Sequence, residues 1–234
     1  MFNIKGYKYT YLLIILLVFT NFCGENAAVQ KIKEGEIEYE INYLDSEREN
    51  PLISLLPRKM ITVFKDNSSY SLIEGFWGTF KLVHITNHLG QNVTLFQILD
   101  KKYMYLADTA ATPLGYPAGS DVKLSFSKKE KYIAGYKCNH ANAVFSNSND
   151  TVDVYYTDQF EIKNPNSNNP YRDVNGVLLE FSVKMAGINM MFKAKRIIGG
   201  KIDSGKFVIP TGYKEVSREE MEKIICEYNR TADK

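Results

Sequence analysis

The sequence has few of the residues that build metal or thiol chemistry. Its 234 residues include three cysteines and three histidines, and it has no Cys-x-x-Cys pair. His84 and His88 are four residues apart in a region of strand and turn character, where that spacing separates them by roughly 13 Å. One metal ion cannot bridge that distance, and we expect both to be exposed side chains at a sheet edge. We therefore predict no metal and no cofactor.

Motifs of the common enzyme classes are also missing. The chain has no Gly-x-Ser-x-Gly elbow, phosphate-binding loop or dinucleotide fingerprint. Cys138 and His140 are two residues apart, so a strand would place thiol and imidazole on one face, as half of a metal site or as a nucleophile with its base. No further ligand pair accompanies them. The sequence therefore predicts a protein that is not an enzyme.

The sequence also has little excess of either charge sign and few prolines. Lys and Arg total 29 against 27 Asp and Glu, a net charge of +2, so no strong field attracts nucleic acid. Seven prolines stand beside 16 tyrosines and 13 phenylalanines. Aromatic enrichment favours strands over helices, and the length suits one core. We expect one mainly β domain that binds no nucleic acid.

The N-terminus has the pattern of an export signal. Lys5 and Lys8 precede an apolar run at residues 11–19. This run is shorter than the roughly 20 residues that a transmembrane helix needs. Cys23 follows it, as in a lipoprotein signal whose cysteine is acylated; ordinary cleavage near Asn26 is the alternative. Both interpretations predict an exported protein.

The remaining chain alternates mostly with a period of two. Residues 35–44 place four apolar side chains on one face, Ile37, Tyr39, Ile41 and Tyr43. Residues 177–185 and 188–194 predict a hairpin, and Ser217 begins a capping box before an amphipathic helix containing Met221, Ile224, Ile225 and Tyr228. We predict a signal peptide at 1–23, a linker at 24–34, a single domain at 35–230 and a tail at 231–234.

Three other features carry expectations. The apolar segment Pro51–Pro57 is bounded by prolines and predicts a short helical or irregular insert. Segments 107–121 and 162–175 predict exposed loops, in which Tyr116 and Tyr171 could stack on a glycan. Cys138 and Cys226 are a candidate disulfide pair in an oxidising compartment, and two free thiols are the alternative.

Several short motifs resemble a known family. A strand like Gly35-Glu36-Ile37-Glu38-Tyr39 is followed by the apolar insert, whose proline precedes Arg58-Lys59-Met60, and then by a meander. This order resembles the lipoprotein carriers of the LolA, LolB and LppX superfold. Three segments resemble more closely a domain-of-unknown-function family of exported Gram-negative lipoproteins grouped with that fold: 133–138, 154–158 and 207–214. The resemblance covers roughly residues 31–223.

This resemblance implies a fold and a function. The fold is one antiparallel sheet curled into an incomplete, half-open barrel, with a short helical insert and a C-terminal amphipathic helix. The implied site is a concave apolar face that holds a lipid, an acyl chain or another hydrophobic ligand, in the periplasm or outer membrane of a Gram-negative bacterium. The candidate lining residues are Leu52, Ile53, Leu55, Leu56, Phe76, Trp77, Met190 and Phe192.

Two alternatives stay open. The candidate lining residues could simply fill the core, because Met and aromatic side chains are common there. The protein could instead be a surface or periplasmic interaction module that binds a protein or glycan through its loops and has no small-molecule cavity.

Overall fold

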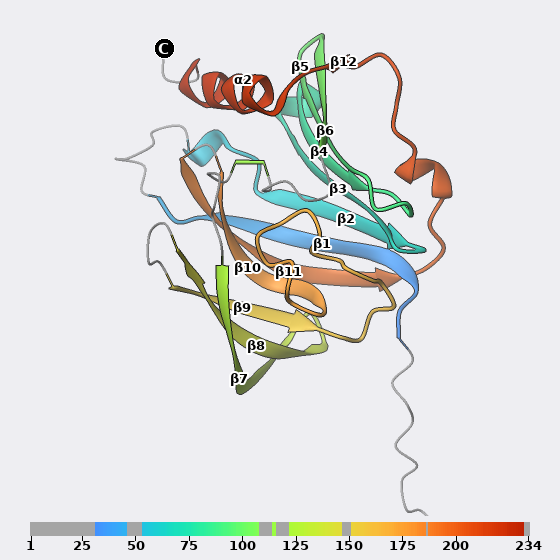
Figure 1. Cartoon of the computed structure of the whole chain (residues 1–234), viewed down its shortest axis with the longest axis vertical. Coiled ribbons are helices and arrows are strands. Elements are labelled where there is room, and N and C mark those ends of the chain that lie inside the picture. The colour runs from blue at the N-terminus through green and yellow to red at the C-terminus, as the bar shows by residue number, and fades with distance from the viewer. Residues whose placement is uncertain are drawn as a thin grey trace, which may run out of the picture. The chain divides into compact units, whose positions relative to one another are not determined.

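The computed structural model describes residues 31–45, 53–107, 114–115, 122–146, 151–185 and 187–231. The proposed signal peptide with Cys23, as well as Leu52 and Tyr116, lie outside these residues. Within them, twelve strands form one sheet (Figure 1). The strands are β1 (Glu34–Tyr43), β2 (Lys59–Lys65), β3 (Ser68–Gly75), β4 (Phe80–Thr86), β5 (Asn92–Ile98), β6 (Lys101–Ala107), β7 (Val122–Ile133), β8 (Tyr136–Phe145), β9 (Thr151–Thr157), β10 (Val177–Met185), β11 (Ile188–Gly199) and β12 (Lys214–Glu215).

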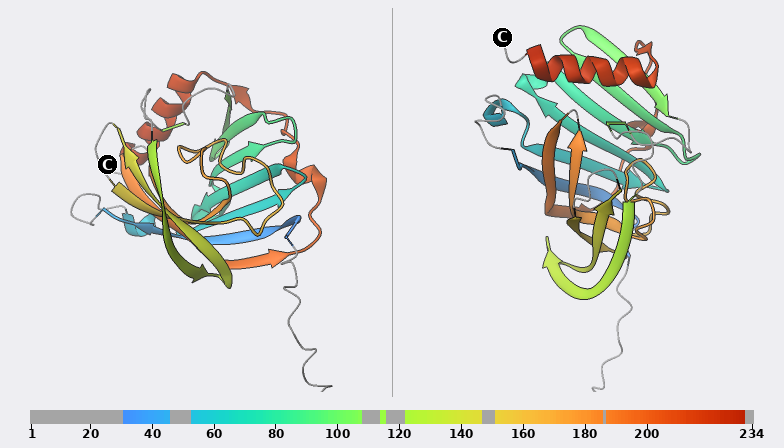
Figure 2. Two further views of the ribbon diagram at one scale, coloured as in Figure 1. Left: turned by 60° about the horizontal axis from the view of Figure 1, so that its bottom comes forward. Right: turned by 60° about the vertical axis from the view of Figure 1, so that its left-hand side comes forward.

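The sheet is open. Its strand order is β12-β6-β5-β4-β3-β2-β1-β11-β10-β9-β8-β7, with β12 and β7 at the two edges. Neighbouring strands are antiparallel except for β12, which runs parallel to β6. Figure 2 shows the strands turning progressively along this order, which is the normal twist of a long sheet. The mainly β class and the single sheet are confirmed, and the sheet is not closed into a barrel.

The first strand occupies the middle of the sheet, between β2 and β11. As its alternation predicts, Ile37, Tyr39 and Ile41 are buried. We call the face of the sheet that carries them the core face. Side chains on the opposite face of β1 form ion pairs with the neighbouring strands: Glu38 with Lys59 and Arg196, and Glu40 with Lys195. This N-terminal strand therefore organises pairing on both of its sides.

Two apolar clusters hold the sheet. The larger one includes Ile37, Phe96 and Leu179 and extends to Met221 of the C-terminal helix. The smaller one packs on the other face of β4 and β5, through Val83, Ile85, Val93 and Leu95, with Ile209 and Tyr213 against it. Adjacent residues such as Leu82 and Val83 thus belong to different clusters, as expected for a strand buried on both faces.

The C-terminal helix α2 (Arg218–Thr231) confirms the predicted capping pattern. The Glu220 backbone N–H donates to the Ser217 hydroxyl oxygen at 3.2 Å. Met221 and Ile225 are buried, and the Tyr228 ring stacks on Phe80 with 5.1 Å between the ring centroids. Among the described residues, no helix is both long and apolar enough to cross a membrane.

The described residues also include three short 3₁₀ helices: η2 (Ile53–Leu55), η3 (Phe76–Gly78) and η4 (Ser204–Phe207). The first confirms a short helical turn within the described part of the proline-bounded insert. The predicted linker is wrong at its end, because Glu34 already belongs to β1 and Ile32 forms a bridge with Phe160. That bridge ties the start of the described chain to the connection between β9 and β10.

Candidate functional site

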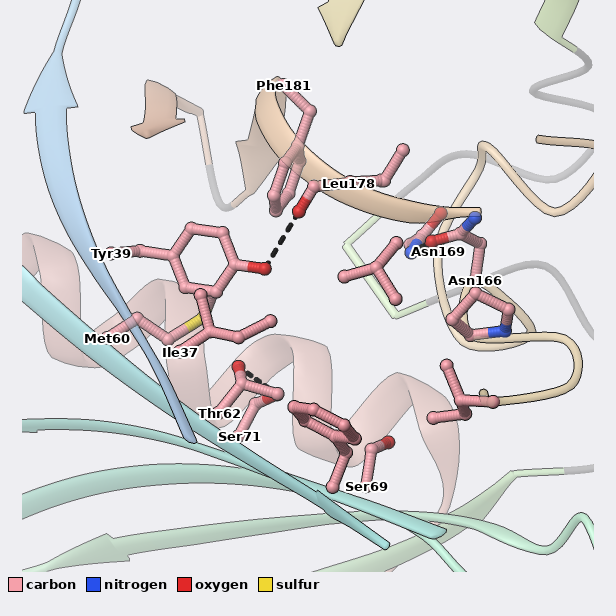
Figure 3. Close-up of a pocket in the computed structure, with 14 residues that line it drawn as sticks. Ile37, Tyr39, Met60, Thr62, Ser69, Ser71, Asn166, Asn169, Leu178 and Phe181 are labelled. Carbon is pink, nitrogen blue, oxygen red and sulfur yellow. Dashed lines mark hydrogen bonds between the residues drawn. The ribbon is translucent and has the colours of Figure 1, made fainter. Parts of the chain in front are cut away.

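A pocket of about 100 Å³ lies on the core face (Figure 3). We call it the core-face pocket. Strands β1, β2, β3 and β10 form its walls, together with the β9–β10 connection, residues 158–176. Its lining residues are Ile37, Tyr39, Met60, Thr62, Phe64, Ser69, Ser71, Ile162, Pro165, Asn166, Asn169, Val177, Leu178 and Phe181.

Strand register brings the lining together. Tyr39 lies opposite Met60, and Ile37 lies opposite Thr62. Thr62 in turn lies opposite Ser71 on β3. Directly opposed residues in an antiparallel pair point to the same face, so the period-2 pattern of β1 continues across three strands. The pocket wall is therefore a direct result of β1 pairing.

The pocket is mainly apolar, and hydroxyl groups of its lining form two hydrogen bonds. The hydroxyl oxygens of Thr62 and Ser71 are 2.9 Å apart, and the Tyr39 hydroxyl donates to the Leu178 carbonyl oxygen at 2.8 Å. Both are drawn in Figure 3. Burial raises the pKa of Tyr39, so its hydroxyl keeps its proton and remains a donor at neutral pH. The hydroxyl groups of Tyr39, Thr62 and Ser71 therefore all have hydrogen-bond partners.

The β9–β10 connection is fixed against the core. The side-chain amide of buried Asn166 donates to the carbonyl oxygens of Val174 at 2.8 Å and Gly176 at 2.9 Å. Tyr171 is fully buried and donates to the carbonyl oxygen of Ser182. The expectation that Tyr171 is exposed and could stack on a sugar is therefore wrong, although other parts of this loop, such as Lys163 and Asn164, are exposed. The backbone of this connection needs polar partners inside the fold, and Asn166 supplies them.

Most of the predicted lining residues lie elsewhere. Leu55 is 58% exposed and Trp77 is fully exposed, so neither faces the core. Ile53 is buried and Leu56 packs against the main cluster. Leu52 and the side chain of Phe76 are outside the described part of the chain. None of the described candidates lines the core-face pocket.

Met190 and Phe192 belong to the core. Both are buried, and the Phe192 ring stacks on Phe181 with 5.2 Å between centroids. Phe181 is itself a lining residue, and Phe192 packs beside it as its cross-strand partner on β11. Met190 and Phe192 therefore lie next to the pocket and not in its lining.

Trp77 occupies an unusual backbone conformation. It has φ 52° and ψ 40° in the turn between β3 and β4, flanked by Phe76 and Gly78. A bulky residue in this left-handed region is strained. Because its indole is fully exposed, no packing compensates for that strain.

A second pocket, of about 560 Å³, lies among the turns at one end of the sheet. It is lined by Lys65, Asp66, Ser68, Asn87, His88, Ser204, Phe207, Val208 and Ile209. Its cation is already engaged, because the Lys65 ammonium group donates to the Ile202 carbonyl oxygen and pairs with Glu34. The lining mixes charged, polar and apolar groups without a dominant chemistry.

The histidines differ from each other. His88 is exposed, as predicted, but His84 is partly buried and its Nδ1 lies 2.9 Å from the Thr94 hydroxyl. Burial lowers the pKa of His84 to about 4. The prediction of an exposed His84 is wrong because the strand places it between β3 and β5.

Cys138 and Cys226 are free thiols, so the candidate disulfide between them is not formed. Cys138 is buried, and burial raises the pKa of its thiol to about 11. His140 does not contact this thiol as a base; it bonds to Ser127 and Asp153 on the neighbouring strands. Across the described ranges, no group of three His, Cys, Asp or Glu residues is placed to hold a metal ion.

Comparison with known proteins gives information about the fold alone. No protein-family model matches the sequence, and no curated protein matches it. Among solved structures, the fold is similar to that of PNGF-II in space group C2, with a TM-score of 0.51 and 14% sequence identity. The match covers 85% of this chain and 33% of that chain, so this chain spans about a third of the PNGF-II chain.

Proposed function

We propose that the protein binds an apolar ligand and that the core-face pocket receives one end of it. The observation that carries this proposal is the pocket itself. Ile37, Met60, Leu178 and Phe181 supply an apolar surface. Three of the four hydroxyl groups at the pocket already bond to one another or to the backbone. An apolar group that packs against them displaces water without leaving these three unpaired.

The pocket volume limits what can enter. Drug-sized ligands occupy about 300–1,000 Å³, whereas an engineered apolar cavity of about 150 Å³ binds benzene. At about 100 Å³, the core-face pocket suits the end of an acyl chain or a small ring. The pocket is not enclosed, so the rest of a longer ligand would lie outside it.

We also infer that the sheet is curled into an incomplete barrel and that the core face is its concave side. Support comes from β7, which contacts β11 although three strands separate them in the sheet order. A flat sheet would keep these strands roughly 19 Å apart, at about 4.8 Å per strand step. Bulges in β7, β10 and the β1–β11 pair add the local bending that such a shape needs.

A substitution that fills the core-face pocket with a larger side chain tests the binding site. We expect a fluorescent fatty acid to bind the wild-type protein, and Ser71→Phe to weaken its affinity at least about tenfold because the ring occupies the pocket. Ser125→Phe is the matched control, since Ser125 is exposed on β7 and lies away from the pocket. Equal affinity in all three proteins would place the ligand elsewhere or show unspecific binding.

We also propose that the protein is exported and that acylation of Cys23 anchors it at the outer membrane; ordinary cleavage would instead leave it in the periplasm. Support comes from the basic start, the apolar run and the cysteine that follows it. Labelling of cells with radioactive palmitate tests the anchor, and Cys23→Ser should abolish the label. A label retained in this variant would exclude Cys23 as the acylated residue.

Trp77 favours a second candidate function, binding of a protein or glycan at the β3–β4 turn. A strained and fully exposed tryptophan contributes nothing visible to packing. Such aromatic side chains often contribute strongly to interfaces. Binding to a glycan array or a partner that is lost in Trp77→Ala, with fatty-acid affinity unchanged, would support this function.

A further inference from the structure

His140 lies at the centre of a hydrogen-bonded chain on three adjacent strands. Its side chain is fully buried in β8. Its Nδ1 is 2.6 Å from the Ser127 hydroxyl oxygen on β7, and its Nε2 is 2.7 Å from Asp153 Oδ1 on β9. Both ring nitrogens therefore have a partner of the type found in nucleophilic catalysis.

Strand register fixes these distances. Ser127 lies directly opposite His140. Asp153 lies opposite Asn142, which makes it the diagonal neighbour of His140 on the same face. On its β9 side, His140 faces Tyr155, whose ring centroid is 4.8 Å from that of the imidazole. The ring is thus held between its two polar partners by packing.

A bulge shapes the surroundings of Ser127. Two extra residues, Lys128 and Lys129, interrupt the β7–β8 pairing directly after it. The Lys129 backbone N–H donates to the Ser127 hydroxyl oxygen at 3.2 Å. Bulges commonly re-aim a side chain, and this one leaves Ser127 exposed while its partner His140 is buried.

The proton positions follow from Asp153. The hydrogen bond from His140 lowers the pKa of Asp153, and the charges of Lys129 and Lys131 act in the same direction. An ionised Asp153 only accepts hydrogen bonds, so Nε2 carries the proton. In the neutral imidazole, Nδ1 is then the acceptor and takes the hydrogen bond from the Ser127 hydroxyl. The order is nucleophile, base and orienting carboxylate.

We propose that Ser127 is an activated nucleophile that cleaves small carboxylic esters, a function independent of the core-face pocket. Ser127 Oγ forms a bond to the acyl carbon while its proton moves to His140 Nδ1. The bond to the alcohol oxygen then breaks, and the alcohol leaves with that proton. Water attacks the acyl-serine, gives one proton to the serine oxygen through His140, and releases the carboxylic acid. Asp153 acts as a positioning residue throughout.

Exposure and charge define the substrate class. Ser127 is exposed, and the Asp153 side chain is 58% exposed, so the site is open to solvent. Small esters with a good leaving group therefore fit it better than substrates that need a deep cavity. Lys129 adds a positive charge that acts on Asp153, and this charge favours an acyl group that carries negative charge.

A fluorophosphonate probe on the intact chain tests the proposal. The serine oxygen forms a bond to phosphorus and fluoride leaves, while the serine proton passes to His140. We expect peptide mapping to find the adduct at Ser127 and to lose it in Ser127→Ala. Ser125→Ala is the matched control, because Ser125 is exposed on the same strand but lies opposite Asn142 rather than a histidine. It should react like the wild type.

The variant Asp153→Asn tests whether Asp153 helps to activate Ser127 through His140 or only stabilises the fold. An amide can donate to Nε2, which would leave Nδ1 protonated and remove the base. We expect the labelling rate to fall at least about tenfold, since a general base typically contributes about 10²–10⁴-fold. Asp153→Glu should restore part of that rate. Circular dichroism should match the wild type in both variants.

Three results would overturn the proposal: no adduct on the wild-type protein, equal labelling of Ser125, or an unchanged rate in a folded Asp153→Asn variant. Hydrolysis of p-nitrophenyl esters by the wild type, with loss in Ser127→Ala, is the expected parallel result. Failure of the fatty-acid titration leaves these outcomes unaffected, so the two proposals are tested separately.

Discussion

Tyr39 on β1 donates its hydroxyl proton to the Leu178 carbonyl oxygen on β10 across 2.8 Å, although β11 separates these strands in the sheet order. The acceptor lies at the irregularity between Leu178 and Glu180, where regular pairing with β9 is interrupted. The long tyrosine side chain thus satisfies a backbone group that the bulge leaves available. The bond also forms part of the core-face pocket, which links pocket shape to the stability of the sheet.

Removing this hydroxyl should destabilise the protein. Tyr39→Phe keeps the ring but leaves the buried Leu178 carbonyl oxygen without this donor, at a cost of about 1–3 kcal/mol in the free energy of unfolding. Urea denaturation measures the change. Tyr132→Phe is the control, because Tyr132 is 74% exposed and its loss should change stability by less than about 0.5 kcal/mol. Equal stability of the two variants would contradict the role of this bond.

His84 should make stability depend on pH. Burial lowers its pKa in the folded protein to about 4, against 6.5 for the free side chain. Between these values the unfolded chain binds more protons, so the unfolding free energy falls as pH decreases from about 6.5 to about 4, by at most about 1.4 kcal/mol per pH unit. Denaturation at several pH values should show a flatter dependence in His84→Gln. An identical dependence in both proteins would exclude His84 as the group responsible.

Trp77 should be replaceable without loss of stability. Asparagine adopts the left-handed conformation more readily than tryptophan, and no contact is lost because the indole is fully exposed. We expect Trp77→Asn to keep or increase the unfolding free energy, by up to about 1 kcal/mol. Unfolding should be followed by circular dichroism, because Trp77 is the one tryptophan of the chain and its replacement removes the tryptophan fluorescence signal. A loss above 1 kcal/mol would mean that the indole stabilises the fold.

Local periodicity in the sequence predicted the regular elements. The alternation from Ile37 to Tyr43 is observed as β1, and the capping box at Ser217 is observed at the start of α2. In both cases the signal and the structure involve residues that are close in the chain. The same holds for the β10–β11 hairpin, whose two strands are joined by a short turn.

The features that sequence reasoning missed depend on contacts between distant segments. Nothing near Tyr171 indicates that it will be buried against Phe145 and Phe181. Ser127 and Asp153 each lie 13 residues from His140, and only the register of three strands brings them together. The pair Cys138 and His140 drew attention to β8, but the polar partners of His140 come from the neighbouring strands β7 and β9.

Native mass spectrometry of the protein purified from cells that produce the full chain tests the binding proposal most directly. We expect the wild-type protein to carry an apolar molecule that organic solvent extracts, and Ser71→Phe to carry markedly less while Ser125→Phe retains it. Wild-type protein free of any bound molecule, which also fails to take up added fatty acid, would contradict the binding of an apolar ligand in the core-face pocket.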